Sequence, residues 1–149
     1  MSIPPGQLVV LDTNVIVDVL RNNQRGQFIE ATYQLTKRIE RPLFSTVTEG
    51  EILGLAKAPK WKWGASKLQT LHEMLDQLVR VDAGLPDVVE SYSDLYAASF
   101  ASGNTTGEND LWIAATAKAA NAVLLTQDTD FDWIPKSLVN VERIKQNPS

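Results

Sequence analysis

The apolar residues of this chain follow two spacings that alternate along the sequence. Short unbroken runs are typical of strands buried on both faces of a parallel sheet, and recurrence every three or four residues is typical of amphipathic helices. Strands are predicted at residues 7–11, 43–45, 78–81, 122–126 and 139–144. Helices are predicted at residues 13–20, 27–39, 66–78 and 111–122, within residues 45–58, and from Pro86 to about Ala101. The alternation predicts an α/β fold, with a mainly parallel central sheet and helices on both faces.

Length and composition fit one folded domain. With 149 residues, 44% of them hydrophobic, the chain is expected to form a single domain over residues 1–149, with a disordered tail from about residue 145. The absence of cysteine excludes thiolate metal ligands, and the single histidine, His72, excludes sites that need two. No apolar run is long enough to span a bilayer, and the first residues lack the pattern of a signal peptide, so a cytoplasmic protein is expected.

Four acidic residues stand at positions that a parallel sheet brings together. Asp12 and Asp128 each follow a buried strand, and Glu51 and Asp110 each lie in or near the first turn of a helix. Strand ends and the helix starts that follow them share one edge of such a sheet, so the four carboxylates are expected to converge. Clustered carboxylates repel one another unless a divalent cation joins them, and ligation by oxygen alone favours Mg²⁺ or Mn²⁺. Such a site suits hydrolysis of phosphodiester bonds.

Several of these acids also have a purely structural interpretation. Asp12 is a good N-cap for the helix that follows it. Thr48 and Glu51 have the spacing of a capping box, in which the acid reaches back to a free N–H at the helix start. Asn109 is a good N-cap, which places Asp110 in the first turn of its helix. Glu49 is expected to be solvated.

One stretch of the chain is basic. Residues 57–67, called the basic segment below, contain four lysines and no acid, with two tryptophans interleaved: Lys57, Lys60, Trp61, Lys62, Trp63 and Lys67. Lysines can neutralise phosphates and indoles can stack on unpaired bases, so these six residues are candidate RNA contacts. The alternative is a connection between helices whose tryptophans cover the core or a dimer contact. The net charge of −4 argues against binding nucleic acid through bulk charge.

Four motifs around the acids resemble those of a known family. VLDTNVIVDVL, VTEGEILGLA, NDLWIAATA and LLTQDTDFD, in this order, resemble a PIN domain and, within that family, the VapC-type toxins. The resemblance extends from Leu8 to about Val141. It implies a compact three-layer α/β/α fold and a Mg²⁺- or Mn²⁺-dependent endoribonuclease. It also implies a homodimer and a small antitoxin protein encoded beside the toxin.

The resemblance assigns roles residue by residue. Asp12, Glu51 and Asp110 match the first three acids of the family. The fourth is Asp128 or Asp130, and Asp128 is preferred because it is nearer the sheet edge, which leaves Asp130 as an alternative ligand. The residues expected to orient a ligand or water around the acids are Thr13, Asn14, Thr126 and Asp130. Asp132 is expected outside the site.

The main alternative function is a PIN-like module that binds RNA or a protein partner without cleaving. An intact set of four acids argues against it, since a module without activity has no need of them. A phosphoacceptor receiver domain is a third interpretation, but it needs paired acids after the first strand and a lysine after a late one. No arginine or lysine lies within the motifs to bind the scissile phosphate. The basic segment, or the other protomer, would have to supply that charge.

Overall fold

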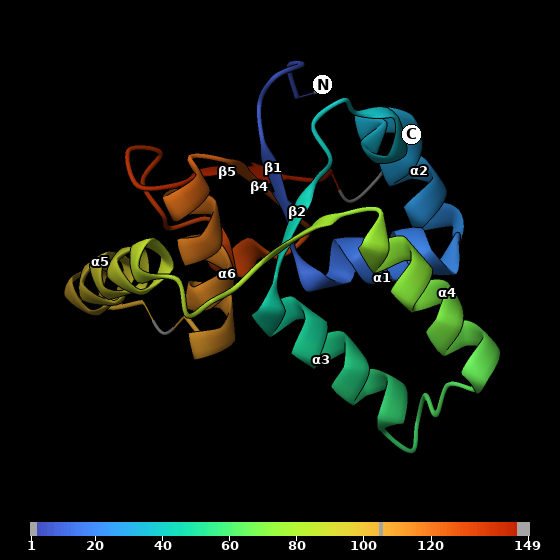
Figure 1. The fold of residues 1–149 in the computed structure, drawn as a ribbon. Coiled ribbons are helices and arrows are strands. Elements are labelled where there is room, and N and C mark those ends of the chain that lie inside the picture. Colours follow the sequence, from blue (N-terminus) through green and yellow to red (C-terminus); the bar gives the residue numbers. More distant parts are fainter. Residues whose placement is uncertain (1–2, 105, 146–149) are drawn as a thin grey trace.

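The structure, a computed structural model, describes residues 3–104 and 106–145. Within these residues the strands form one parallel sheet in the order β3-β2-β1-β4-β5 (Figure 1). The strands are β1 (Val9–Leu11), β2 (Leu43–Ser45), β3 (Val79–Val81), β4 (Val123–Thr126) and β5 (Asn140–Arg143). The helices are α1 (Thr13–Arg21), α2 (Gln24–Tyr33), α3 (Thr46–Lys57), α4 (Ala65–Asp76), α5 (Pro86–Ser102) and α6 (Glu108–Ala120), with short 3-10 helices η1 (Leu35–Lys37) and η2 (Thr129–Phe131).

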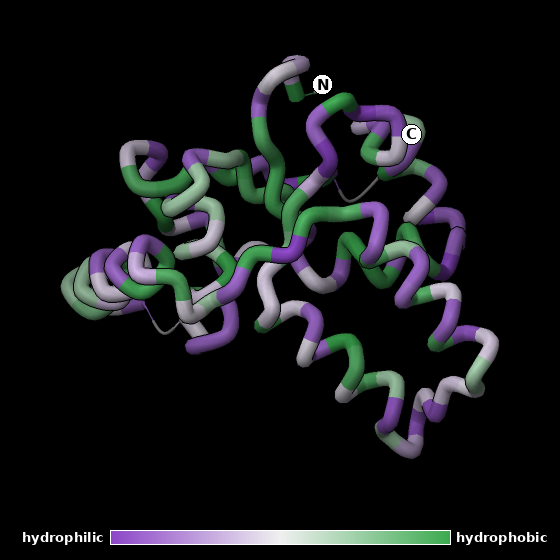
Figure 2. Tube along the Cα trace, in the orientation of Figure 1, coloured by the Kyte–Doolittle hydropathy of each residue, from purple (hydrophilic) through white to green (hydrophobic). Residues whose placement is uncertain are grey.

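Helices cover both faces of the sheet, which confirms the predicted three-layer fold. Successive residues of a strand point to opposite faces, so a strand that is buried throughout contributes to two cores. Val9 and Leu11 pack with α1, α2 and α4, whereas Val10 packs with α5 and α6. Figure 2 shows the resulting concentration of hydrophobic residues in the central strands. The described residues include no helix long and apolar enough to cross a membrane.

The second predicted helix, residues 27–39, is wrong in its extent, because α2 ends at Tyr33. Gln34 adopts the left-handed conformation (φ 52°), and the chain continues as η1. The Glu30 carboxylate accepts hydrogen bonds from the backbone N–H and the hydroxyl of Thr36, which replace the bonds that a longer helix would form. The turn buries Leu35 and leaves Ile39 91% exposed, so the helical spacing of these two residues misled the prediction.

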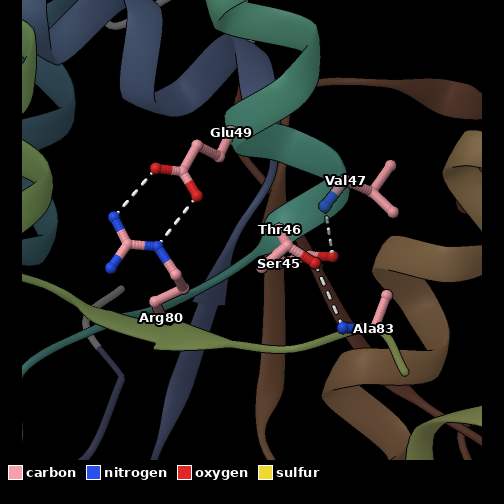
Figure 3. A network of polar contacts seen from close by, with 6 residues as sticks. All are labelled: Ser45, Thr46, Val47, Glu49, Arg80 and Ala83. Carbon is pink, nitrogen blue, oxygen red and sulfur yellow. Dashed lines mark hydrogen bonds and ion pairs between the residues drawn. The ribbon is translucent and has the colours of Figure 1, made fainter. Parts of the chain in front are cut away.

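Three side chains fix the start of α3 against the end of the sheet (Figure 3). The Ser45 hydroxyl accepts a hydrogen bond from the Val47 N–H, and the Thr46 hydroxyl accepts one from the Ala83 N–H beyond β3. Glu49 forms a two-point ion pair with Arg80 of β3, with both N–O distances 2.8 Å. Glu49, which was expected to be solvated, keeps 20% of its side chain exposed while this ion pair holds it. Helix α3 leaves the sheet edge in a fixed direction, and this direction determines where Glu51 lies.

Other predicted boundaries agree with the structure to within a few residues, and Pro86 opens α5 as expected. The disordered tail was predicted from about residue 145, and its residues 146–149 lie outside the described residues.

Candidate metal centre

The four predicted acids line one hollow at the carboxyl edge of the sheet. Asp12 follows β1, Asp128 follows β4, Glu51 lies in the second turn of α3, and Asp110 lies in the first turn of α6. The hollow has a volume of about 500 Å³. It is lined by Asp12, Thr13, Asn14, Glu51, Gly54, Leu55, Asp110 and Asp128. Gly54 and Leu55 carry no signal in the sequence, and they line the hollow because they follow Glu51 on the same helix.

Asp12 is both an N-cap and a member of the acidic group, so its two interpretations hold together. One carboxylate oxygen accepts a hydrogen bond from the Thr13 N–H at 2.8 Å, at the start of α1. The other oxygen accepts a bond from the Thr126 hydroxyl at 2.7 Å, at the end of β4. Only 4% of the Asp12 surface is exposed. These contacts hold the carboxylate in one orientation between the ends of β1 and β4.

Glu51 does not form the capping box that its spacing with Thr48 suggests. Ser45 is the N-cap of α3, so Thr48 already lies within the helix. The Glu51 carboxylate instead accepts a hydrogen bond at 2.6 Å from the Thr13 hydroxyl, which also lies 3.3 Å from the Thr48 hydroxyl. Thr13 thus contacts Glu51 through its side chain and Asp12 through its backbone.

Asn109 is not the N-cap of its helix, contrary to the prediction. The cap is Gly107, so α6 begins at Glu108 and both Asn109 and Asp110 lie in its first turn. The Asn109 amide donates a hydrogen bond to the second oxygen of Glu51, at 3.2 Å. Glu108 was the sequence signal for this earlier helix start, because an acidic residue is favourable in the first turn of a helix.

Asp130 joins the acids on the Asp110 side. One carboxylate oxygen from each of Asp110, Asp128 and Asp130 lies within 4.8 Å of the others. Asp130 itself lines an adjacent shallow hollow, and its N–H donates to the Asp128 carboxylate at 2.9 Å. Asp132 lines the same adjacent hollow as Asp130 and pairs with Arg143 at 3.0 Å, outside the hollow that holds the four acids. Both candidates for the fourth acid are therefore within reach of Asp110.

The acids lie close enough to disturb one another's ionisation. Burial, together with the neighbouring charges of Asp12, Asp128, Asp130 and Glu51, raises the pKa of Asp110 to about 7. Burial also raises the pKa of Asp12, and Asp128 and Glu51 add to this effect. The hydrogen bonds from Thr126 and from the Thr13 N–H oppose the rise at Asp12.

The donor set fits a hard divalent cation. The acids offer carboxylate oxygens as ligand atoms. Among the described residues, the group whose oxygens lie within 4.8 Å of one another is Asp110, Asp128 and Asp130, and Asp12 and Glu51 line the same hollow outside that group. The ion pairs found in the described part of the chain join Arg80 to Glu49, Lys118 to Asp94 and Arg143 to Asp132. None of them involves an acid of the hollow. The mutual repulsion of these acids is thus left for a cation to neutralise.

The candidate RNA contacts lie outside the hollow. The basic segment connects α3 to α4, and Figure 1 shows this connection at the tip of an arm that leads away from the sheet. Trp61 and Trp63 are half-buried and pack against the core formed by α1, α2 and α4. This is the arrangement of the alternative interpretation, in which the tryptophans cover the core.

This chain has a parallel sheet between two helical layers, with acids gathered at the carboxyl edge of the sheet. Comparison with known families identifies the class of proteins that it belongs to. The profile of the PIN domain matches residues 9–136, so this chain belongs to the PIN domain family. It is 32% identical over 130 residues to the VapC ribonuclease Y4jK of Sinorhizobium fredii, covering 82% of this chain and 88% of that relative. The predicted resemblance to VapC-type PIN domains is thereby confirmed.

Solved structures of VapBC proteins share the fold. In VapBC2 from Rickettsia felis, bound to a DNA fragment from its promoter, the similar chain has a TM-score of 0.72 and 25% identity, covering 91% of this chain and 98% of that one. In VapBC-5 of Mycobacterium tuberculosis, a member of the VapBC family of toxin–antitoxin systems, the similar chain has a TM-score of 0.69 and 28% identity, covering 93% and 99%. The likeness therefore extends over almost the whole chain.

Proposed function

We propose that this protein is a Mg²⁺- or Mn²⁺-dependent endoribonuclease and the toxin of a VapBC-type pair. The observation that carries the proposal is the convergence of Asp12, Glu51, Asp110 and Asp128 on one hollow, while the ion pairs of the described residues involve other acids. The VapC ribonuclease relative supports the reaction, and the solved VapBC structures support the toxin–antitoxin context.

The metal would be held by Asp12, Asp110 and Asp128, with Glu51 completing the set and Asp130 as an alternative to Asp128. When bound, a divalent cation supplies Lewis acidity toward the scissile phosphate and lowers the pKa of a water molecule. Thr126 and Thr13 orient the Asp12 and Glu51 carboxylates by donating hydrogen bonds to them. Asn14 lines the same hollow and is placed to contact a ligand or water. An ionised carboxylate of this group accepts the proton from the attacking water.

We further propose an antitoxin partner and a homodimer. A hollow of about 190 Å³ lies between α1, α4 and residues 35–42. Its lining combines apolar Val19, Met74 and Leu78 with Arg38 and Arg41, and it could receive a side chain of a docked antitoxin segment. Recovery of no small partner from the native host in a pull-down would contradict the antitoxin. Exposed apolar side chains on α5, among them Tyr96 and Phe100, support a protein contact there. A sedimentation profile of a monomer at all concentrations would contradict the homodimer.

The test is cleavage of total RNA by the purified chain with Mn²⁺ or Mg²⁺. Cleavage should disappear with EDTA and in Asp12→Asn, which keeps an N-cap residue at the start of α1 and so preserves the fold. Asp132→Asn is the matched control, because Asp132 is an acid that pairs with Arg143 outside the hollow. Cleavage that survives Asp12→Asn would overturn the proposed site. Metal binding without cleavage of any RNA would favour the non-catalytic binding module.

A further inference from the structure

The wall of the acidic hollow continues into the basic segment through a single helix. Glu51, Gly54 and Leu55 of α3 line the hollow, and α3 ends at Lys57, the first residue of the basic segment. At 1.5 Å per residue, Lys57 lies about 9 Å from Glu51 along the helix axis. The basic segment therefore begins about two helical turns from the acid that α3 contributes to the hollow.

The basic segment presents unneutralised positive charge. Lys57, Lys60, Lys62 and Lys67 are all exposed, and the ion pairs of the described residues involve none of them. No acidic residue occurs in the sequence between Glu51 and Glu73. In a protein of net charge −4 this leaves a local patch of positive charge at the end of α3 that is farther from the sheet.

The two tryptophans of the basic segment contact each other, the core and two cations. The rings of Trp61 and Trp63 stack at a centroid distance of 5.8 Å, with an angle of 8° between their planes. The Arg21 guanidinium lies 4.2 Å from the centre of the Trp61 ring, and the Lys67 ammonium lies 4.7 Å from that of Trp63. Cations thus flank the aromatic pair, and the pair packs against the core.

The backbone fixes a lysine at the turn of the segment. The N–H groups of Trp61 and Lys62 donate to the Ala58 carbonyl, and that of Trp63 donates to the Ala56 carbonyl. Lys62 has a φ of 37°, in the left-handed region where glycine or asparagine is more easily accommodated. A long cationic side chain is therefore carried at a strained position of a hydrogen-bonded turn.

We propose that the basic segment binds the phosphate backbone of single-stranded RNA next to the nucleotides held at the acidic hollow. This inference rests on the proposed function. Basic side chains inside the hollow would pair with the metal-binding acids, so lysines that bind phosphates beyond the scissile one are expected outside it. The exposed lysines that follow the end of α3 meet this requirement, and lysines bind phosphates without regard to base sequence.

The test compares two triple variants that remove the same charge from different faces. In the first, Lys57, Lys60 and Lys62 are each changed to Gln, and in the control Lys37, Lys136 and Lys145 are changed in the same way. Both are made in the Asp12→Asn chain with Mn²⁺, and binding of a fluorescent oligouridylate of about ten nucleotides is measured by anisotropy over a range of salt concentrations. The slope of log affinity against log salt should flatten by about 0.7 for each phosphate that is no longer neutralised, or roughly 2 for the first variant.

Several outcomes would overturn the inference. An unchanged salt slope in the first variant, or an equal change in the control, would overturn it. Binding of polyglutamate is measured alongside. A first variant that still binds RNA but no longer binds polyglutamate would indicate that the segment binds an acidic protein partner. Cleavage of long RNA by the chain with Asp12 intact separates the two proposals. If the first variant cleaves RNA with an unchanged KM, the proposed role of the basic segment is wrong and the proposed nuclease activity stands. A chain that neither binds nor cleaves RNA removes both.

Discussion

Asp12 and Glu51 differ from Asp110 in what surrounds their carboxylates. Asp12 accepts hydrogen bonds from a β4 hydroxyl and a backbone N–H, and Glu51 accepts them from α1 and α6 side chains. The groups that change the pKa of Asp110 are burial and four neighbouring acids, which raise it to about 7, and no hydrogen-bond donor is among them. The first two acids are fixed by neutral donors before any ligand arrives, whereas Asp110 faces neighbours of its own charge. The site thus has two halves. In the preset half, Asp12 and Glu51 are held by hydrogen bonds from neutral donors, and in the other half Asp110 needs a cation to offset the charge of its neighbours.

The largest expected effect comes from removing charge from the preset half. Asp12→Asn should lower RNA cleavage by about 10³-fold or more, because a carboxylate that holds the cation is replaced by a neutral amide. Initial rates at saturating Mn²⁺ measure this, with circular dichroism to verify the fold. Activity within a factor of about ten of the parent chain would mean that Asp12 serves the fold alone.

Removing a donor and leaving the acids intact should have a smaller effect. Thr13→Val preserves side-chain shape but deletes the hydroxyl that binds Glu51 at 2.6 Å. We expect metal affinity and cleavage to fall by roughly 10–100-fold, as is usual when a group that orients a metal ligand is removed. Mn²⁺ titration by calorimetry gives a readout that does not depend on activity. Thr13→Ser, which keeps the hydroxyl, should restore most of the affinity, and an equal decrease in both variants would refute the positioning role.

The repulsion between Asp110 and its acidic neighbours also predicts that the stability of the metal-free protein depends on pH. The folded-state pKa of Asp110, about 7, exceeds its ordinary value of 3.8, so its contribution to stability is present below about pH 4 and is lost as pH rises toward 7. After allowance for solvent screening of this partly exposed side chain, this decrease in stability is on the order of 1–2 kcal/mol. Thermal unfolding in EDTA should therefore show Tm falling over this range.

Asp110→Asn provides the control for that measurement, because it cannot ionise. Its Tm should vary less with pH and should exceed that of the unaltered chain at and above neutral pH. If Tm varied with pH in the same way in both proteins, ionisation of Asp110 would not be the source of the pH dependence. Adding Mn²⁺ should raise the Tm of the unaltered chain more than that of the variant.

The smallest effect is expected at an acid on α3 that lies outside both halves. Glu49→Gln removes the ion pair with Arg80, whose side chain is 47% exposed, and should lower the free energy of unfolding by about 1 kcal/mol or less. Mn²⁺ affinity and cleavage should stay unchanged, as chemical denaturation, calorimetry and initial rates can check. A marked decrease in Mn²⁺ affinity in this variant would show that metal binding responds to any negative charge on α3. The distinction between the acids of the hollow and Glu49 would then be wrong.

The fold was predictable from sequence because its pattern is strong. A buried parallel strand gives an unbroken apolar run, as in residues 9–11 and 123–125, and the acids that follow such runs mark the carboxyl edge of the sheet. This reasoning brought Asp12 and Asp128 to one place without knowledge of any contact. It also anticipated that Glu51 and Asp110 would join them, since helix starts share that edge.

The contacts between these residues were not predictable in the same way. Local spacing allowed Glu51 to cap its own helix, and the choice of Thr13 as its partner depends on how α1 lies against α3. Asn109 was a suitable cap by residue type, and only the packing of α6 turns it toward Glu51. Helix α2 ends at Tyr33 while the Glu30 side chain binds Thr36 beyond it, a contact that the spacing of apolar residues does not reveal.

The bond between Thr126 and Asp12 joins residues 114 positions apart, and it lies where β4 pairs with β1. Pairings of such long sequence separation close late in folding, because a large loop must lose its entropy before they form. A chain with its first three strands in place has Asp12 and Glu51 but lacks the acids that follow β4. Because β4 is buried throughout and packs in the same core as α1, the capacity to hold a metal should appear only when β4 has paired with β1.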